Sequence, residues 1–279
     1  MSLKELRRRI SSVKSTQKIT SAMKMVASAK LRRLQERLNF GAEYLQRLKL
    51  IGNHLGEIHQ DLEILSPWLS NEGKQNLIII FGAERGLCGS FHTNFLRYAN
   101  QVIDEQQSAQ LVVFGQKAKE SLKGRYKQNP LLDICTTPSM PAFLDLAKAV
   151  EPLKKSKEIG KIYILGSAFK NILKQEMYFK PFSLVEHKLP QRAFDTTIFE
   201  PSPDVFLPHF CSQYLSASFH QAWLESLTGE MASRMTAMDN ATRNATDMIH
   251  DLSLEYNRTR QAHITTELNE IIAGSEGAK

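Results

Sequence analysis

The chain has 279 residues, of which 42% are hydrophobic and 23% are charged, as in ordinary soluble proteins of one large or two small domains. No apolar run approaches the roughly 18 residues of a membrane-spanning helix, and the first residues show no signal-peptide core. Three scattered cysteines are too few for a disulfide framework, so we expect reduced thiols in a cytosolic or membrane-peripheral protein.

Charge is distributed unevenly along the chain, whose formal net charge is +7. Residues 1–50 contain 13 Lys and Arg and 3 acidic residues, whereas residues 205–279 contain 5 Lys and Arg and 9 acidic residues. A basic N-terminal region indicates an acidic partner. Nucleic acid is one candidate, and a carboxylate-rich protein surface is another.

A long helix is predicted over most of residues 2–65. Ser2 and Glu5 form a capping-box pattern, in which each side chain satisfies a free backbone N–H of the first turn. Apolar residues then occupy heptad positions a and d over residues 3–13 and again over residues 31–55. This repeat is typical of a coiled-coil seam.

Between those two runs the seam positions are polar or small: Gln17, Thr20, Lys24 and Ala27. A coil selected for stability would place Leu or Ile there, each contributing about 1.5 to 3 kcal/mol on burial. We therefore expect this stretch to serve something other than stability.

The middle of the chain alternates between buried-strand and helix patterns. Short apolar runs predict strands at residues 77–81, 111–115, 161–166 and 175–185. The segments between them predict helices that end near Gln107 and Leu122, and a third from about Pro141 to Lys155. This alternation predicts an α/β domain with a largely parallel sheet.

The glycine-bearing loop from Gly82 to Ser90 follows the first predicted strand, where α/β domains bind nucleotides. It lacks the Lys of a P-loop and the first glycine pair of a dinucleotide fingerprint. Cys88 lies near a predicted helix start, but His92 is its only neighbouring base, so a buried thiol is the favoured interpretation. With no metal-binding spacing of His or Cys either, we predict no catalytic site, cofactor or metal.

The C-terminal quarter predicts one further long helix. Between Pro208 and Ala273 there is no proline and one glycine, Gly229, while apolar or small residues recur every three or four positions. At about 1.5 Å per residue this helix would reach roughly 100 Å, too long to be buried in a small domain. Antiparallel pairing would bring its soft, polar stretch, residues 228–245, near the polar seam of the N-terminal helix.

Three stretches resemble the gamma subunit of the F-type ATP synthase: TQKITSAMKMVASAKLRR at residues 16–33, RGLCGSF at residues 85–91, and residues 230–274. The resemblance implies an α/β fold, with a long antiparallel coiled coil of N- and C-terminal helices and an inserted Rossmann-like α/β domain. The corresponding division of the chain is residues 1–65 and 205–274 for the helices, 74–203 for the central domain and 275–279 for a tail.

The function implied by this resemblance is that of a central rotor stalk. It would transmit torque between the membrane c-ring and the catalytic ring, and so couple proton flow to ATP synthesis or hydrolysis without catalysing a reaction itself. The implied partners of this single copy are the hexameric ring of alpha and beta subunits, the epsilon subunit and the c-ring, with no cofactor, bound nucleotide or nucleic acid. The implied location is peripheral, on the cytoplasmic face of a bacterial membrane.

The resemblance also assigns candidate contact residues. Contacts with the beta subunits are implied for Met23, Lys24, Lys30, Arg32, Arg33, Arg260 and Gln261. The rotor tip would include Ile264, Leu268, Ile271 and Ile272. Contacts with the c-ring or epsilon subunit are expected at Arg192, Phe194, Asp195 and Glu200.

Two other functions remain open from the residues alone. A basic coiled-coil arm on an α/β domain could bind RNA, although Phe40 and Tyr44 are the only aromatic residues among the first 50 and base stacking needs such side chains. An enzyme that uses the Gly82 to Ser90 loop is the other, and nucleotide binding by the isolated protein would support it.

Overall fold

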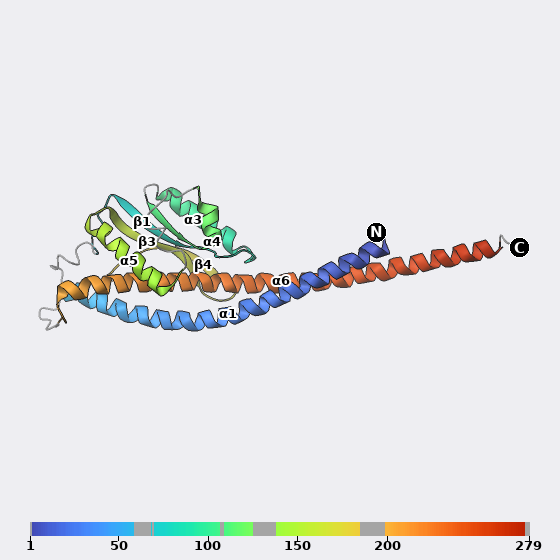
Figure 1. Cartoon of the computed structure of the whole chain (residues 1–279), viewed down its shortest axis with the longest axis horizontal. Coiled ribbons are helices and arrows are strands. Elements are labelled where there is room, and N and C mark those ends of the chain that lie inside the picture. The colour runs from blue at the N-terminus through green and yellow to red at the C-terminus, as the bar shows by residue number, and fades with distance from the viewer. Residues whose placement is uncertain are drawn as a thin grey trace. The chain divides into compact units, whose positions relative to one another are not determined.

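The computed structural model describes residues 2–58, 68, 70–106, 109–124, 138–184 and 199–276. Two long helices flank a series of strands and shorter helices, in the order that the sequence predicts (Figure 1). The helices are α1 (Leu3–Ile58), α3 (Phe91–Glu105), α4 (Gln116–Leu122), α5 (Met140–Lys155) and α6 (Pro203–Glu276). The strands are β1 (Gln75–Phe81), β2 (Gln110–Phe114), β3 (Ile159–Phe169) and β4 (Gln175–Pro181).

The chain divides into two compact units. Unit 1 consists of residues 1–28 and 234–279, and unit 2 consists of residues 29–233. The helices α1 and α6 each contribute to both units. The domain boundaries given above stay a prediction.

Unit 2 contains a four-stranded sheet with the strand order β2-β1-β3-β4. The central strand β1 runs parallel to β2 and β3, with Ile79 opposite Val112 and Ile164. The edge strand β4 is antiparallel to β3. The predicted strands and the largely parallel sheet are confirmed, although β4 ends at Pro181 and Val185 lies outside the described residues.

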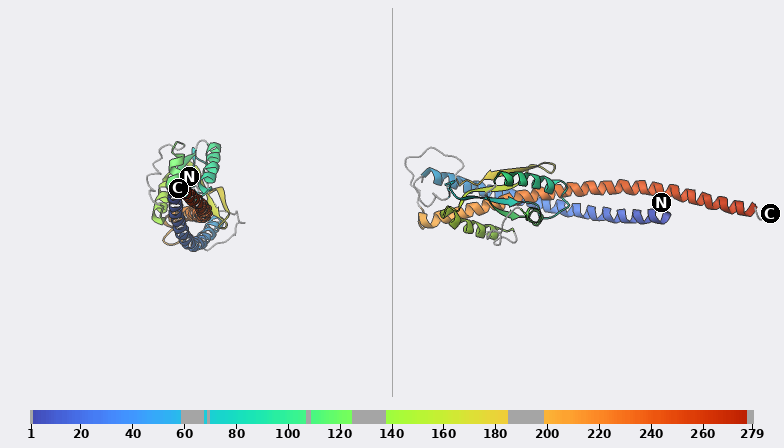
Figure 2. Two further views of the ribbon diagram at one scale, coloured as in Figure 1. Left: turned by 90° about the vertical axis from the view of Figure 1, so that its right-hand side faces the viewer. Right: turned by 90° about the horizontal axis from the view of Figure 1, so that it is seen from above.

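Helices cover both faces of this sheet. The central strand β1 is apolar at every position from Leu77 to Phe81, so both of its faces need cover, and all five side chains are fully buried. Successive side chains of a strand point to opposite faces, so Ile78 and Ile80 pack with α3 and α4. On the other face, Ile79 and its neighbours pack with residues of α5, α6 and α1 (Figures 1 and 2). The result is a three-layered α/β domain.

The helix α6 begins earlier than the sequence predicts. It starts at Pro203, and Pro208 lies within it rather than at its beginning. Proline is favourable at the first position of a helix, where its fixed φ is suitable and its missing N–H has no helical partner. This describes Pro203. Pro208 lies one turn further on, where its missing N–H costs one backbone hydrogen bond, and packing of the neighbouring Leu207 and Phe210 in the core offsets that cost.

The N-terminal end of α1 is capped as predicted. The backbone N–H of Ser2 donates to Glu5 Oε2 at 2.9 Å, and the N–H of Glu5 donates to Ser2 Oγ at 3.2 Å. The hydrogen bond from the Ser2 backbone lowers the pKa of the Glu5 carboxyl group.

None of the helices in the described ranges is long and apolar enough to span a membrane.

Candidate functional site

The helix pair of unit 1 carries the polar seam that the sequence predicts. Gln17 Nε2 donates to Thr246 Oγ1 at 2.7 Å, and the hydroxyl groups of Thr20 and Thr242 are hydrogen-bonded at 2.8 Å. Residue numbers rise along α1 as those of their partners fall along α6, so the pairing is antiparallel. Hydroxyl and amide groups thus take positions where a conventional coiled coil has Leu or Ile.

A small ionic network continues this seam. Lys24 Nζ lies 2.6 Å from Asp239 Oδ1, and Arg243 lies 2.8 Å from Asp239 Oδ2. The hydrogen bond from Lys24 lowers the pKa of the Asp239 carboxyl group, and Arg243 lowers it further. Lys24 is therefore already engaged within unit 1, while Met23 beside it is only partly buried.

Three other candidate contact residues on α1 belong to unit 2. Lys30, Arg32 and Arg33 are all exposed, and no ion pair involves them within the part of the chain that the structure describes. Their charged groups are hydrated and available to an acidic partner.

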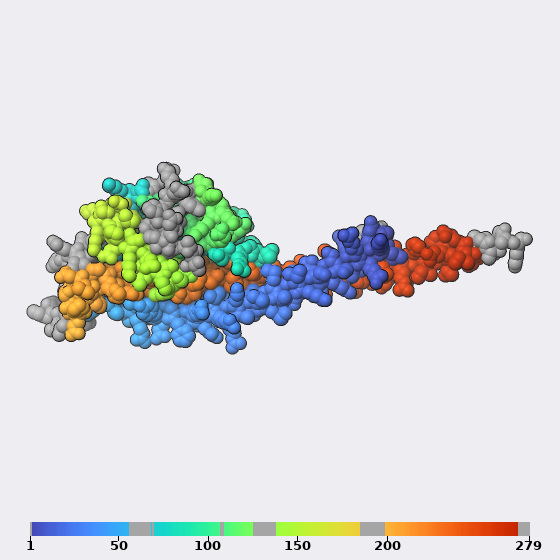
Figure 3. All heavy atoms as spheres, in the orientation of Figure 1, coloured from blue at the N-terminus to red at the C-terminus, as the bar shows by residue number. Residues whose placement is uncertain are grey.

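The remaining candidate contacts lie on α6, in a stretch exposed throughout. Arg260, Gln261 and the four apolar residues Ile264, Leu268, Ile271 and Ile272 all have exposed side chains. In the register set by Lys24 with Asp239, the first residue of α1, Leu3, reaches only to about residue 260. Figure 3 shows this part of α6, in red, extending past the N-terminal end of α1.

These residues do not form one site. Within unit 1, Arg260 lies 21 positions after Asp239, the partner of Lys24, on the same helix, which corresponds to about 30 Å along the axis. The candidate contacts are therefore separate surfaces. Among the residues expected near the c-ring or epsilon subunit, Glu200 is exposed, whereas Arg192, Phe194 and Asp195 lie outside the described residues.

The loop after β1 is occupied by a carboxylate of the chain itself. The carboxylate of Glu230, on α6, accepts hydrogen bonds from the consecutive backbone N–H groups of Glu84 at 2.8 Å and Arg85 at 3.3 Å. Successive N–H groups of this kind form a concave anion site, the arrangement with which other α/β loops hold phosphate. Glu230 is only 1% exposed, so its carboxylate fills that position.

The same loop contacts its surroundings at two further points. Glu84 Oε2 accepts a hydrogen bond from the backbone N–H of Gln116, the first residue of α4, where a negative charge is favoured. Ser233 of α6 donates to the backbone carbonyl of Cys88 at 2.9 Å. The loop is thus attached to both α4 and α6.

Cys88 is buried, which confirms the favoured interpretation of this thiol. Its Sγ lies 3.6 Å from the Arg85 carbonyl, whereas His92 Nε2 lies 3.2 Å from the hydroxyl of Ser121. Burial lowers the pKa of the His92 imidazole. One ring nitrogen of the histidine is therefore engaged with α4.

Glu230 was not among the residues singled out by sequence reasoning. A signal was present, because Glu230 is the one acidic residue between Glu225 and Asp239 in a stretch of small and apolar residues. A carboxylate in such a stretch indicates a buried group with a specific partner. The identity of that partner depends on the approach of segments about 145 residues apart, which periodicity does not reveal.

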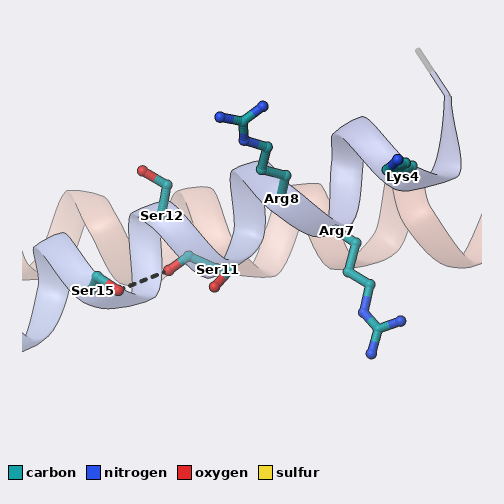
Figure 4. A pocket seen from close by; sticks show the side chains of 6 residues that line it. All are labelled: Lys4, Arg7, Arg8, Ser11, Ser12 and Ser15. Carbon is teal, nitrogen blue, oxygen red and sulfur yellow. Dashed lines mark hydrogen bonds between the residues drawn. The ribbon is translucent and has the colours of Figure 1, made fainter.

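A shallow hollow along α1 gathers basic and hydroxyl side chains: Lys4, Arg7, Arg8, Ser11, Ser12 and Ser15. Figure 4 shows Arg7 and Arg8 pointing to opposite sides of the helix, and the hydroxyl of Ser15 donates to the backbone carbonyl of Ser11. The cationic groups do not converge, so the hollow is not built to hold an anion. The described residues also contain no cluster of His, Cys, Asp and Glu that could bind a metal ion.

Comparisons with known proteins identify relatives over the whole chain. The family model described as ATP synthase matches residues 2–277. The ATP synthase gamma chain of Trichlorobacter lovleyi is 36% identical over 100% of this chain and 99% of its own length. That of Pelagibacter ubique is 39% identical over 98% of each chain.

Solved structures resemble the fold. A chain in the cryo-EM structure of the Euglena gracilis mitochondrial ATP synthase, OSCP/F1/c-ring, rotational state 3, superposes with a TM-score of 0.64 at 20% identity, covering 99% of this chain and 94% of that one. A chain of the rotor structure of the same enzyme gives a TM-score of 0.62. These similarities confirm the predicted fold class of two long terminal helices with an inserted α/β domain.

Proposed function

The chain belongs to the ATP synthase gamma-chain family, and we propose the surfaces through which it acts as the central rotor stalk of an F-type enzyme. A gamma chain is a non-catalytic subunit that transmits torque between the membrane c-ring and the alpha/beta ring, and so couples proton flow to ATP synthesis or hydrolysis. Its partners are the alpha and beta subunits, the epsilon subunit and the c-ring. The full-length match to bacterial gamma chains carries this conclusion.

The rotor acts by differential contact. A ligand or partner shifts a conformational equilibrium only when it interacts differently with the two states. A rotor with a uniform surface would contact all beta subunits equally and change nothing. The separate surfaces on this chain, one basic on α1 and one at the exposed end of α6, support such asymmetric contact.

The basic surface is assigned to the beta subunits. Lys30, Arg32 and Arg33 are exposed, and they suit a carboxylate-rich loop that passes the rotor as it turns. Exposed ion pairs contribute only about 0.2 to 1 kcal/mol each, so such contacts can form and break at every step. Met23 and Lys24, in unit 1, are also proposed to contact the beta subunits, and Asp239 holds Lys24 in place.

Arg260 and Gln261 are assigned to a reversible catch on a beta-subunit loop. An exposed Arg can hold a carboxylate through two parallel hydrogen bonds, and the neighbouring Gln adds both a donor and an acceptor. The exposed apolar residues from Ile264 to Ile272 form the proposed rotor tip beyond this catch.

The double variant Arg260→Ala and Gln261→Ala tests the catch. We expect a complex reconstituted with alpha and beta subunits to assemble normally but to turn over ATP more slowly, by roughly tenfold if two charge-assisted hydrogen bonds are lost. Arg258→Ala, an exposed arginine on the same helix, is the matched control. Normal turnover by the double variant would rule out the assignment.

The enzyme's gamma chain is part of the F1 portion, peripheral to the membrane, and the cytoplasmic face of a bacterial membrane is the proposed location for this one. Co-expression with alpha and beta subunits tests the function as a whole, since a complex with stimulated ATPase activity is expected. The comparisons give no support to the alternative of an RNA-binding coiled coil.

A further inference from the structure

Within unit 2, α6 carries three polar residues on one face: Ser226, Glu230 and Ser233, referred to below as the polar stripe. Spacings of four and three residues place them one above another along the helix. Ser226 and Glu230 are buried and Ser233 is partly buried. The neighbouring part of α6, from Leu207 to Ala222, packs mainly through apolar side chains, with single polar bonds from Ser212 to Glu151 and from Gln221 to the Leu38 carbonyl.

Each member of the polar stripe bonds to the backbone of another element. Ser226 Oγ accepts from the N–H of Ser167, in β3, at 3.0 Å. Ser233 donates to the carbonyl of Cys88 at 2.9 Å, and Glu230 holds the two N–H groups of the loop after β1. One helix face is therefore bonded to two segments at the carboxyl-terminal edge of the sheet.

Backbone partners give these bonds a mechanical property that apolar packing lacks. The hydrophobic effect is non-directional, and it is retained when a helix turns or slides slightly against a flat apolar surface. Hydrogen bonds weaken steeply with angle, and a backbone group cannot follow a moving side chain by changing rotamer. Turning α6 would also leave the Glu230 carboxylate buried without its N–H donors, which is costly.

We propose that the polar stripe is a torque-bearing clamp, which holds the α/β domain of unit 2 at a fixed rotational angle about α6. Ser226, Glu230 and Ser233 are positioning residues in this role, because they act by fixing the orientation of other elements of the chain. The proposal rests on the function as a rotor stalk, in which load passes between this domain and the long helix. It explains why a buried carboxylate is kept where an apolar residue would pack at lower cost.

The sharpest single change is Glu230→Gln, which keeps the size of the side chain but replaces one acceptor oxygen with a donor facing a backbone N–H. Ser233→Ala removes the second bond, and Ser233→Thr restores a hydroxyl group. Ser218→Ala is the matched control, because the hydroxyl of Ser218 is buried on the same helix but donates to Tyr214 of that helix, 2.8 Å away.

The experiment uses the complete complex, reconstituted in vesicles, and measures ATP hydrolysis and proton pumping together. If α6 rotates relative to the α/β domain, the catalytic ring can hydrolyse ATP without turning the c-ring. We therefore expect Glu230→Gln to pump about half as many protons per ATP, or fewer, with Ser233→Ala intermediate. The complexes carrying Ser233→Thr and Ser218→Ala should keep the wild-type ratio, which a general loss of stability would not predict.

An unchanged ratio in the assembled Glu230→Gln complex overturns the clamp, as does an equal loss in Ser218→Ala. If Glu230→Gln prevents assembly, Ser233→Ala decides the matter in the same way, since a wild-type ratio there overturns the proposal. Failure of the wild-type chain to couple hydrolysis to pumping would instead count against the rotor function itself. The two failures are thereby distinguished.

Discussion

At the scale of single residues, Asp239 links the two helices of unit 1 through Lys24 and Arg243. The carboxylate is 24% exposed, and its hydrogen bond to Lys24 lowers its pKa. A carboxyl group whose pKa is depressed by folding stabilises the protein above its unfolded pKa, about 3.9, and this contribution is lost as the pH falls through the folded value. The stability of the helix pair should therefore fall as the pH is lowered through the acidic range.

Asp239→Asn tests this dependence. The variant should unfold at a lower urea concentration than the wild type at neutral pH, because the amide keeps a hydrogen-bond acceptor but loses the charge. The difference should shrink below about pH 4, where the wild-type carboxylate takes up its proton. Glu270 is an exposed acid on α6 that forms no ion pair among the described residues, so Glu270→Gln should show no such difference.

Glu230 marks the limit of sequence reasoning at this scale. The capping box of Ser2 and Glu5 could be predicted because both partners lie in one turn. The pairing of Glu230 with the loop after β1 could not, because a carboxylate has many possible donors and only the folded chain selects among them. Sequence reasoning tested the glycine loop as a nucleotide site and disfavoured it for want of the required motifs, and in the structure a carboxylate of the chain itself occupies the backbone N–H groups there.

At the scale of elements, strands and helices were predictable where their apolar periodicity was strong. The buried strand β1 is apolar at all five positions from Leu77 to Phe81, and the approach of the two polar helix stretches was expected from antiparallel pairing, although their register comes only from the structure. The start of α6 was less predictable, since proline both begins helices and interrupts them. Packing of Leu207 and Phe210 decides the outcome there.

The polar seam gives a prediction about two paired elements. Thr20→Val alone should destabilise the helix pair by about 0.5 to 1.5 kcal/mol, because it leaves the hydroxyl of Thr242 with one hydrogen bond fewer. The double variant with Thr242→Val should recover most of this loss, since two apolar side chains of similar shape then face each other. Urea unfolding of the wild type, the two single variants and the double variant measures the coupling energy between the two hydroxyl groups. Losses of stability that simply add in the double variant would contradict the prediction.

The packing of α1 within unit 2 gives a second prediction at this scale. A Cβ atom added at Gly52 would lie 2.7 Å from the backbone carbonyl oxygen of Leu184, which cannot move aside alone. Gly52→Ala should therefore destabilise the protein by about 1 to 3 kcal/mol, although Ala is the better helix former by about 1 kcal/mol. At Gly41 the nearest atom is the side-chain oxygen of Gln221, 2.5 Å away, so Gly41→Ala should cost less. Thermal unfolding of both variants checks which one loses more stability. An equal loss in both, or a larger loss in Gly41→Ala, would contradict the prediction.

At the scale of the whole molecule, different parts of the chain are stabilised by different means. Unit 2 has a large apolar core around its sheet, whereas unit 1 relies on two helices with a partly polar seam. The end of α6 has neither, since every side chain from residue 260 to 272 is exposed. The exposed apolar residues there support the proposal that this surface is covered by a partner in the assembled enzyme.

Removing residues 263–279 separates folding from rotor function. The deleted residues up to 272 all have exposed side chains, so the purified chain should unfold at an unchanged temperature and lose only the helical signal of the missing residues. The assembled complex, however, loses the proposed rotor tip while keeping Arg260 and Gln261. Torque, measured by single-molecule rotation against a viscous load, should therefore fall although ATP turnover persists. A clearly lowered unfolding temperature would contradict the view that this stretch exists for its partners and not for the fold, and undiminished torque would show that the apolar tip carries no load.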